Sequence, residues 1–177
     1  HPLPQAEGDM IDMMVDHRSE ILRLRAGSSV QLDPDTLVEV LWPPASQPAD
    51  LTANDKSLVL RVTCGGKRIL FPGDLAQKGQ AQLLADNTDL RADILILPHH
   101  GAWTKSLSAF FEAVSPEVVL LSASRGLDRY HTPNAARDEF IKTLHGERCY
   151  TTPKHGWIHL TFNKEGTIRA ETMRADR

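Results

Sequence analysis

The order of hydrophobic and polar positions predicts strands in the first half of the chain. Residues 37–42 (LVEVLW) alternate between apolar and polar side chains and predict a strand, which Pro43 and Pro44 end. Two further strands are predicted within 57–64 (SLVLRVTC) and 68–73 (RILFPG). The glycine pair 65–66 between them is a hairpin signal. This half of the chain therefore favours antiparallel pairing.

The middle of the chain alternates between strands and helices. Residues 77–86 predict a helix, 92–98 a strand buried on both faces, 106–114 a helix capped by Ser106, and 117–124 a second buried strand. The remaining expected elements are an amphipathic helix in 8–22, a helix in 134–144, and closing strands in 149–152, 157–162 and 167–173. Hairpins followed by strand–helix–strand units indicate a layered α/β or α+β domain.

Composition narrows the class of protein. With 177 residues, 41% apolar and 24% charged, the chain fits one globular domain, and no linker divides it. The net charge of −3 excludes a strong basic field, although local basic patches remain open. No apolar stretch reaches the roughly 20 residues of a membrane span. Cys64 and Cys149 are read as small buried apolar residues, with a single disulfide left open.

Polar side chains follow three of the predicted strands. Asp74 ends one strand, the pair His99 and His100 ends the next, and His131 follows the third. In layered α/β proteins such groups gather at the carboxyl edge of the sheet. A carboxylate with imidazoles suits a divalent metal such as zinc or manganese. The alternatives are a turn-forming role for Asp74 and His131, and a hydrogen-bonded structural pair for the two histidines.

Taken in order, these segments resemble a known family. The segments are VLWPP, NDKSLVLRV, GKRILFPGDL, ADILILPHHG, SPEVVLLSAS, HTPN and CYTTPKHGWIHLTF. Over about residues 20–172 the chain resembles the C-terminal part of the metallo-β-lactamase-like domain of ComEC-type competence proteins. The resemblance implies an α+β fold, the four-layer αββα sandwich, of which the single domain 1–177 would hold only the C-terminal portion.

The resemblance also implies a function. ComEC-type proteins are bacterial inner-membrane channels that import single-stranded DNA during natural transformation. Their metallo-β-lactamase-like domain is proposed to be a nuclease. The implied partners are DNA and the channel portion of the same polypeptide, and the implied place is the extracytoplasmic face of the inner membrane. The cofactor would be zinc or manganese, and the sequence leaves the oligomeric state open.

Four residues carry over as candidate catalytic groups. Asp74 matches the family's "TGD" aspartate, which would bridge two metals, and His99 matches a metal-site histidine. His100 would either hydrogen-bond to a metal ligand or face the substrate, and which of the two histidines binds metal stays open. His131 matches a histidine near the rim of the site, although here a threonine separates it from the following proline.

An N-x-x-S element, Asn54 and Ser57, also matches, with either a site role or a strand-capping role. The family's HxHxDH motif, however, has no counterpart in the chain. Either HPLPQA at the start is a decayed version, or the motif lies upstream of His1. The stretch 10–32 favours the second reading, because it resembles the family's segment downstream of the motif. We therefore expect an incomplete metal site, with Asp74 and His99 near each other and few further ligands. We also expect an apolar sheet face without its partner sheet, and an inactive isolated chain.

Three functions compete at this point. The first is a metal-dependent phosphodiesterase or nuclease that acts on DNA during its uptake. The second is a degenerate, non-catalytic module that binds DNA or a partner protein. The third is a stand-alone metallo-hydrolase of another substrate, because a fold does not fix a function.

Overall fold

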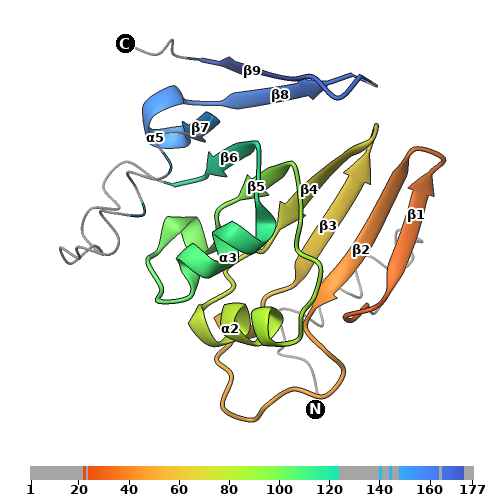
Figure 1. Ribbon diagram of the computed structural model, residues 1–177, viewed down its shortest axis with the longest axis vertical. Coiled ribbons are helices and arrows are strands. Elements are labelled where there is room, and N and C mark those ends of the chain that lie inside the picture. Colours follow the sequence, from red (N-terminus) through yellow and green to blue (C-terminus); the bar gives the residue numbers. More distant parts are fainter. Residues whose placement is uncertain are drawn as a thin grey trace, which may run out of the picture.

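The computed structural model describes residues 22, 24–123, 140, 144, 148–163 and 165–173. Seven strands form one sheet in the order β1 to β7, and β8 with β9 forms a separate hairpin (Figure 1). The strands are β1 (Ser29–Asp33), β2 (Thr36–Trp42), β3 (Val59–Cys64), β4 (Lys67–Phe71), β5 (Ile94–Ile96), β6 (Val118–Leu121), β7 (Arg148–Thr151), β8 (Ile158–Phe162) and β9 (Ile168–Thr172). The helical elements are η1 (Asn54–Lys56), α2 (Gln77–Ala85), η2 (Pro98–Gly101), α3 (Leu107–Val114) and α5 (Thr152–His155).

The sheet is mixed. Strands β1 to β4 are antiparallel, and the Gly65–Gly66 turn brings Cys64 opposite Lys67, as the hairpin signal predicts. Strands β4 to β7 are parallel, with α2 and α3 in the β4–β5 and β5–β6 connections. The α+β class predicted from the sequence is thus confirmed.

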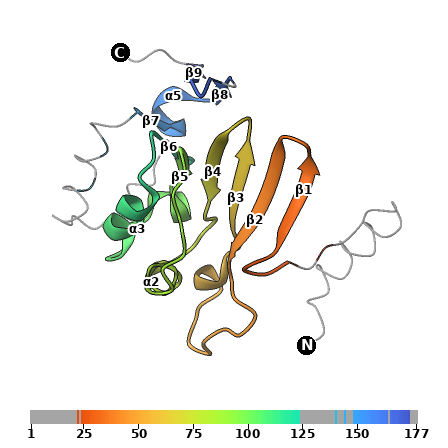
Figure 2. The same ribbon diagram turned by 45° about the vertical axis from the view of Figure 1, so that its right-hand side comes forward.

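Helices and hairpin cover opposite faces of the sheet. Figure 2 shows α2 and α3 together on one side, where Leu83 and Phe110 pack in one core with Leu95. On the other side Ile168 of the β8–β9 hairpin packs with Ile94. Because Ile94 and Leu95 are neighbours that point to opposite faces and are both fully buried, β5 is buried on both faces, as predicted.

The structure departs from the sequence prediction at one cap and contains four elements that were not predicted. Ser106 occupies the N-cap position of α3, but its side chain makes no capping hydrogen bond. Its hydroxyl lies instead within hydrogen-bond distance of two acceptors, the carbonyl of Gln77 and the side-chain oxygen of Gln80. Strand β1 and the short elements η1, η2 and α5 were not predicted. The expected helix in 8–22, and most of that in 134–144, lie outside the described residues. No helix within the described ranges is long and apolar enough to cross a membrane.

Candidate functional site

Three turns meet at the carboxyl edge of the parallel strands. Asp74 follows β4, the His99–His100 pair follows β5, and Ser122 follows β6. Because these strands are parallel neighbours, their ends lie side by side. The backbone N–H of His99 donates to the carbonyl oxygen of Gly73 at 2.9 Å, which ties the histidine turn directly to the aspartate turn.

His100 faces Asp74. Its Nδ1 lies 2.9 Å from the carbonyl oxygen of Ser122, and a carbonyl only accepts, so Nδ1–H donates. In the neutral ring this leaves the lone pair on Nε2, which lies 3.6 Å from Oδ1 of Asp74. Both side chains are about half exposed, at 57% for His100 and 49% for Asp74. A backbone carbonyl that fixes the far nitrogen is the usual support of a metal-binding imidazole.

His99 meets a different partner. Its Nε2 lies 3.3 Å from the amide nitrogen Nδ2 of Asn54. An amide nitrogen only donates, so Nε2 of His99 accepts this bond and the ring proton is on Nδ1. The two adjacent imidazoles therefore point at different side chains, although they leave the same strand.

The histidine turn has an unusual backbone. His99 (φ 49°), His100 (φ 53°) and Gly101 (φ 77°) all lie in the left-handed region. For a non-glycine residue this conformation costs roughly 1–2 kcal/mol. At Gly101 the positive φ itself disfavours a side chain, and a Cβ atom would stand 2.7 Å from Cδ1 of Leu121, which would have to move. Backbone strain of this kind is concentrated at functional sites, which supports a role for this turn.

A buried carboxylate anchors the loop that carries Asn54. Asp55 is 3% exposed, and its Oδ1 accepts the backbone N–H groups of Lys78 (2.9 Å) and Gly79 (3.1 Å) in the first turn of α2. Its Oδ2 accepts the N–H and the hydroxyl of Thr52 at 3.1 and 2.6 Å. The indole N–H of Trp42 donates to the Asp55 carbonyl at 2.7 Å. Asp55 thus caps α2 from a distant part of the chain.

The environment of Asp55 keeps it ionised. Burial by itself would raise the pKa of this carboxyl, but the hydrogen bonds from Thr52, Gly79 and Lys78 outweigh it, and the pKa lies below its ordinary value. Asp55 was not predicted from the sequence, because its helix partners lie 23 and 24 residues away. No local pattern marks such a cap.

The other sequence candidates are placed only in part. Ser57 lies beside Gly73: a Cβ built on that glycine would stand 3.5 Å from the Ser57 Cβ. His131 lies outside the described residues. Within the described ranges, no group of three or more His, Cys, Asp or Glu side chains gathers as a metal site. At the carboxyl edge of the parallel strands, Oδ1 of Asp74 and Nε2 of His100 face each other.

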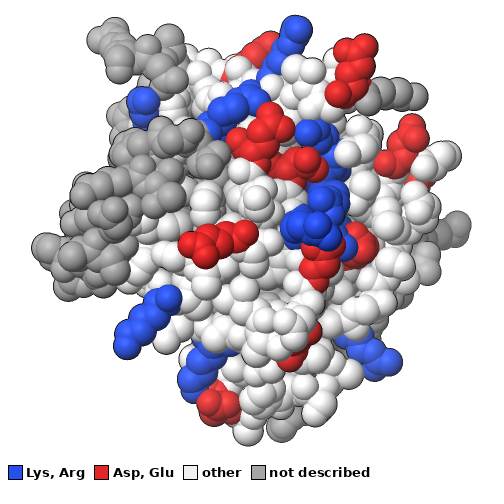
Figure 3. All heavy atoms as spheres, in the orientation of Figure 1, with Lys and Arg blue, Asp and Glu red and all other residues white. Residues whose placement is uncertain are grey.

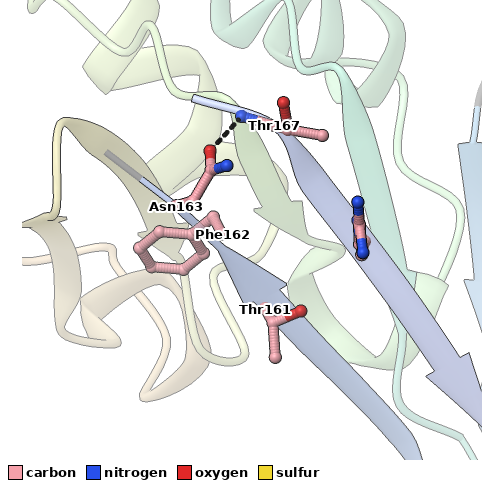
Figure 4. Close-up of a pocket in the computed structure, with 5 residues that line it drawn as sticks. Thr161, Phe162, Asn163 and Thr167 are labelled. Carbon is pink, nitrogen blue, oxygen red and sulfur yellow. Dashed lines mark hydrogen bonds between the residues drawn. The ribbon is translucent and has the colours of Figure 1, made fainter. Parts of the chain in front are cut away.

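Two further features of the surface are a pocket and the distribution of charge. A pocket of about 280 Å³ is lined by residues of the β8–β9 hairpin (Figure 4), namely Thr161, Phe162, Asn163, Thr167 and Arg169. None of these is a predicted site residue. On the face shown in Figure 3, Lys and Arg side chains are interspersed with Asp and Glu. This mixture is in keeping with the small net charge of −3.

The fold and the cluster define a class: an α+β domain with an aspartate–histidine group at the carboxyl edge of its parallel strands. No family model matches the chain. It is 32% identical over 130 residues to "Competence protein ComA" of Neisseria gonorrhoeae, a match covering 73% of this chain and 18% of that protein. It is 29% identical over 149 residues to "ComE operon protein 3" of Bacillus subtilis (strain 168), covering 84% and 19%.

A third relative, "Uncharacterized protein YcaI" of Escherichia coli (strain K12), is 29% identical over 127 residues, covering 71% of the chain and 16% of that protein. These matches confirm the resemblance to ComEC-type competence proteins over most of the chain. The chain spans less than a fifth of the length of the curated relatives it matches.

Proposed function

We propose that the chain is part of a metal-dependent hydrolase domain, a phosphodiesterase or nuclease that acts on DNA during its uptake. The observation that carries the proposal is the pairing of Asp74 with His100, whose far nitrogen is held by Ser122. The similarity to two competence proteins supports the biological setting.

The donor chemistry fits a divalent metal. A carboxylate oxygen and an imidazole nitrogen with a fixed tautomer are ligands that zinc and manganese accept. We propose that Asp74 and His100 hold the ion. Two assignments stay predictions from the sequence: His99 as a metal ligand, and His131 as a residue at the rim of the site. When bound, such an ion lowers the pKa of coordinated water and offsets charge on a phosphodiester. The chain itself would orient the two ligand atoms, on Asp74 and His100, at the exposed carboxyl edge of the parallel strands.

We further propose that the domain is the C-terminal portion of a four-layer αββα sandwich. Helices α2 and α3 cover one face of the sheet. Phe71, which pairs with Leu60 next to the buried Leu70, points to the opposite face and is 40% exposed. An exposed phenylalanine on a sheet face is what a partner sheet would cover.

A metal titration with matched variants tests the proposed function. Zinc and manganese are titrated calorimetrically into the chain, Asp74→Asn, His100→Gln and the control Asp35→Asn, whose side chain is exposed in the β1–β2 turn. We expect each of the two site variants to weaken metal binding by about tenfold or more and the control to leave it unchanged. Equal binding by all four proteins would refute the site.

DNA cleavage is measured with the same proteins on single-stranded and duplex oligonucleotides. Any metal-dependent cleavage should require Asp74. Two tightly bound ions per chain would contradict the incomplete site expected from the sequence. DNA binding without metal binding would favour a non-catalytic module instead.

A further inference from the structure

We infer that Asn54, anchored by the buried Asp55, is a positioning residue that assigns the two adjacent histidines to different roles. Its amide holds Nε2 of His99, so that His100 is the histidine whose Nε2 faces Asp74. That these roles serve metal binding rests on the proposed function. The hydrogen bond between Asn54 and His99 is independent of that function.

Asn54 is held in place from both sides. Its carbonyl oxygen accepts the N–H of Ser57 at 3.1 Å within η1 and the N–H of Ala76 at 3.4 Å, just before α2. The next residue, Asp55, is bound to the first turn of α2 through its side chain and to Trp42 through its carbonyl. The Asn54 side chain therefore projects from a loop fixed to the helix layer, and not from a loose connection.

His99 is held at both ends as well. Its backbone N–H donates to Gly73, and its ring accepts from Asn54. Both the ring and the backbone of His99 are therefore hydrogen-bonded in the orientation that the structure shows. The hydrogen bond from Asn54 thus occupies the Nε2 lone pair of His99. With that lone pair free, His99 could compete with His100 for the proposed metal ion at Asp74.

The two rings share a tautomer and differ in what Nε2 meets. In both, the proton is on Nδ1: His100 donates it to Ser122, and the donation from Asn54 leaves Nε2 of His99 unprotonated. Nε2 of His99 meets an amide donor, whereas Nε2 of His100 meets a carboxylate at 3.6 Å. The Asn54 amide accounts for the partner of the His99 ring, and the Ser122 carbonyl holds the His100 ring.

The test is the tautomer of His99, read by nitrogen-15 NMR of the histidine-labelled chain without metal. At about pH 8 an ordinary imidazole is neutral, and His99→Gln identifies its signals. We expect His99 to carry its proton on Nδ1 in the unsubstituted chain. In Asn54→Asp the new carboxylate can only accept, so Nε2 of His99 becomes protonated while His100 keeps its tautomer.

The matched control is Asn87→Asp, which makes the same change of charge in the exposed turn after α2. It should leave both rings as they are. A His99 that carries its proton on Nε2 in the unsubstituted chain overturns the inference without any variant. So does a folded Asn54→Asp protein in which His99 behaves as in the control.

The two proposals fail separately. If Asp74→Asn does not affect metal binding but His99 changes its tautomer as expected, the positioning by Asn54 stands and the proposed function falls. If metal binding depends on Asp74 but the tautomer of His99 ignores Asn54, the proposed function stands and this inference falls.

Discussion

Replacing Asp55 with alanine is expected to destabilise the fold by about 3 kcal/mol. The carboxylate is 3% exposed and accepts four hydrogen bonds, two from the start of α2 and two from Thr52. Alanine keeps none of these acceptors, so the N–H of Gly79 is left buried without its partner. The substitution removes one anchor from two segments at once.

The magnitude follows from two overlapping losses. Loss of a helix N-cap costs about 1 and up to about 2 kcal/mol. Removing a charged acceptor from its hydrogen-bond donors lowers the free energy of unfolding by roughly 1.5–3 kcal/mol. The cost is smaller where water can take the place of the acceptor. Only the bond to Gly79 is fully buried, so the sum stays near 3 kcal/mol. For a chain of this length that is a fall in melting temperature of about 6–12 °C.

The assay is urea unfolding followed by circular dichroism. The control is Asp86→Ala at the other end of α2, where an exposed carboxylate lies at the unfavourable end of the helix dipole and its removal should change stability by less than about 0.5 kcal/mol. A loss below about 1 kcal/mol for Asp55→Ala, or a loss equal to that of the control, would refute the anchoring role. The same variant should also give His99 a mixture of tautomers, because Asn54 is no longer held.

The stability difference between the chain and Asp55→Ala should depend on pH. The pKa of Asp55 is lower in the folded protein than its ordinary value, so the folded state favours the ionised form. The contribution is therefore complete above about pH 5 and shrinks as the pH falls below about 4, towards the lowered folded pKa. Unfolding curves between pH 3 and 7 measure it. A difference that grows on acidification would contradict the sign.

Two further predictions concern the turn after β5 and a partly buried thiol. Gly101→Ala should cost more stability than Gly66→Ala: both glycines are left-handed, but a Cβ at position 101 meets Leu121 at 2.7 Å and one at position 66 meets nothing. Equal losses in urea unfolding would show that packing against Leu121 adds nothing. Cys149, whose pKa is raised by burial, should react with iodoacetamide much more slowly in the folded chain than in urea, and equal rates would contradict its burial.

The local pattern of apolar and polar residues was enough to predict the elements in which that pattern is pronounced. The run 92–98 has apolar residues that suit burial on both faces, and Ile94 and Leu95 are indeed both buried. The β3–β4 hairpin follows from a glycine pair between alternating runs. Strand β1 lacks such a signal, because most of its side chains are exposed at the edge of the sheet and it pairs only with β2. Its formation depends on the partner strand rather than on its own residues.

The candidate site was predictable only as a neighbourhood. Parallel strands bring their carboxyl ends together, so Asp74 and the histidine pair were expected at one edge. Which histidine faces Asp74 depends on three successive left-handed residues, and on a loop 45 residues away in sequence that supplies Asn54 to His99. Neither follows from residue type or spacing. Tertiary contacts decide both.

The cluster of Asp74, His99 and His100 is therefore held in two ways, by the sheet and by the loop that carries Asn54. The strand ends fix the backbone positions of Asp74 and His100, and these positions persist as long as the sheet does. The orientation of His99 depends instead on the loop that Asp55 ties to the start of α2. A change that frays the first turn of α2 should thus leave Asp74 and His100 paired while it releases the ring of His99. If the ring of His99 is released first, the Asp74–His100 pair is supported by the sheet. If both are lost together, the pair depends on the helix layer as well.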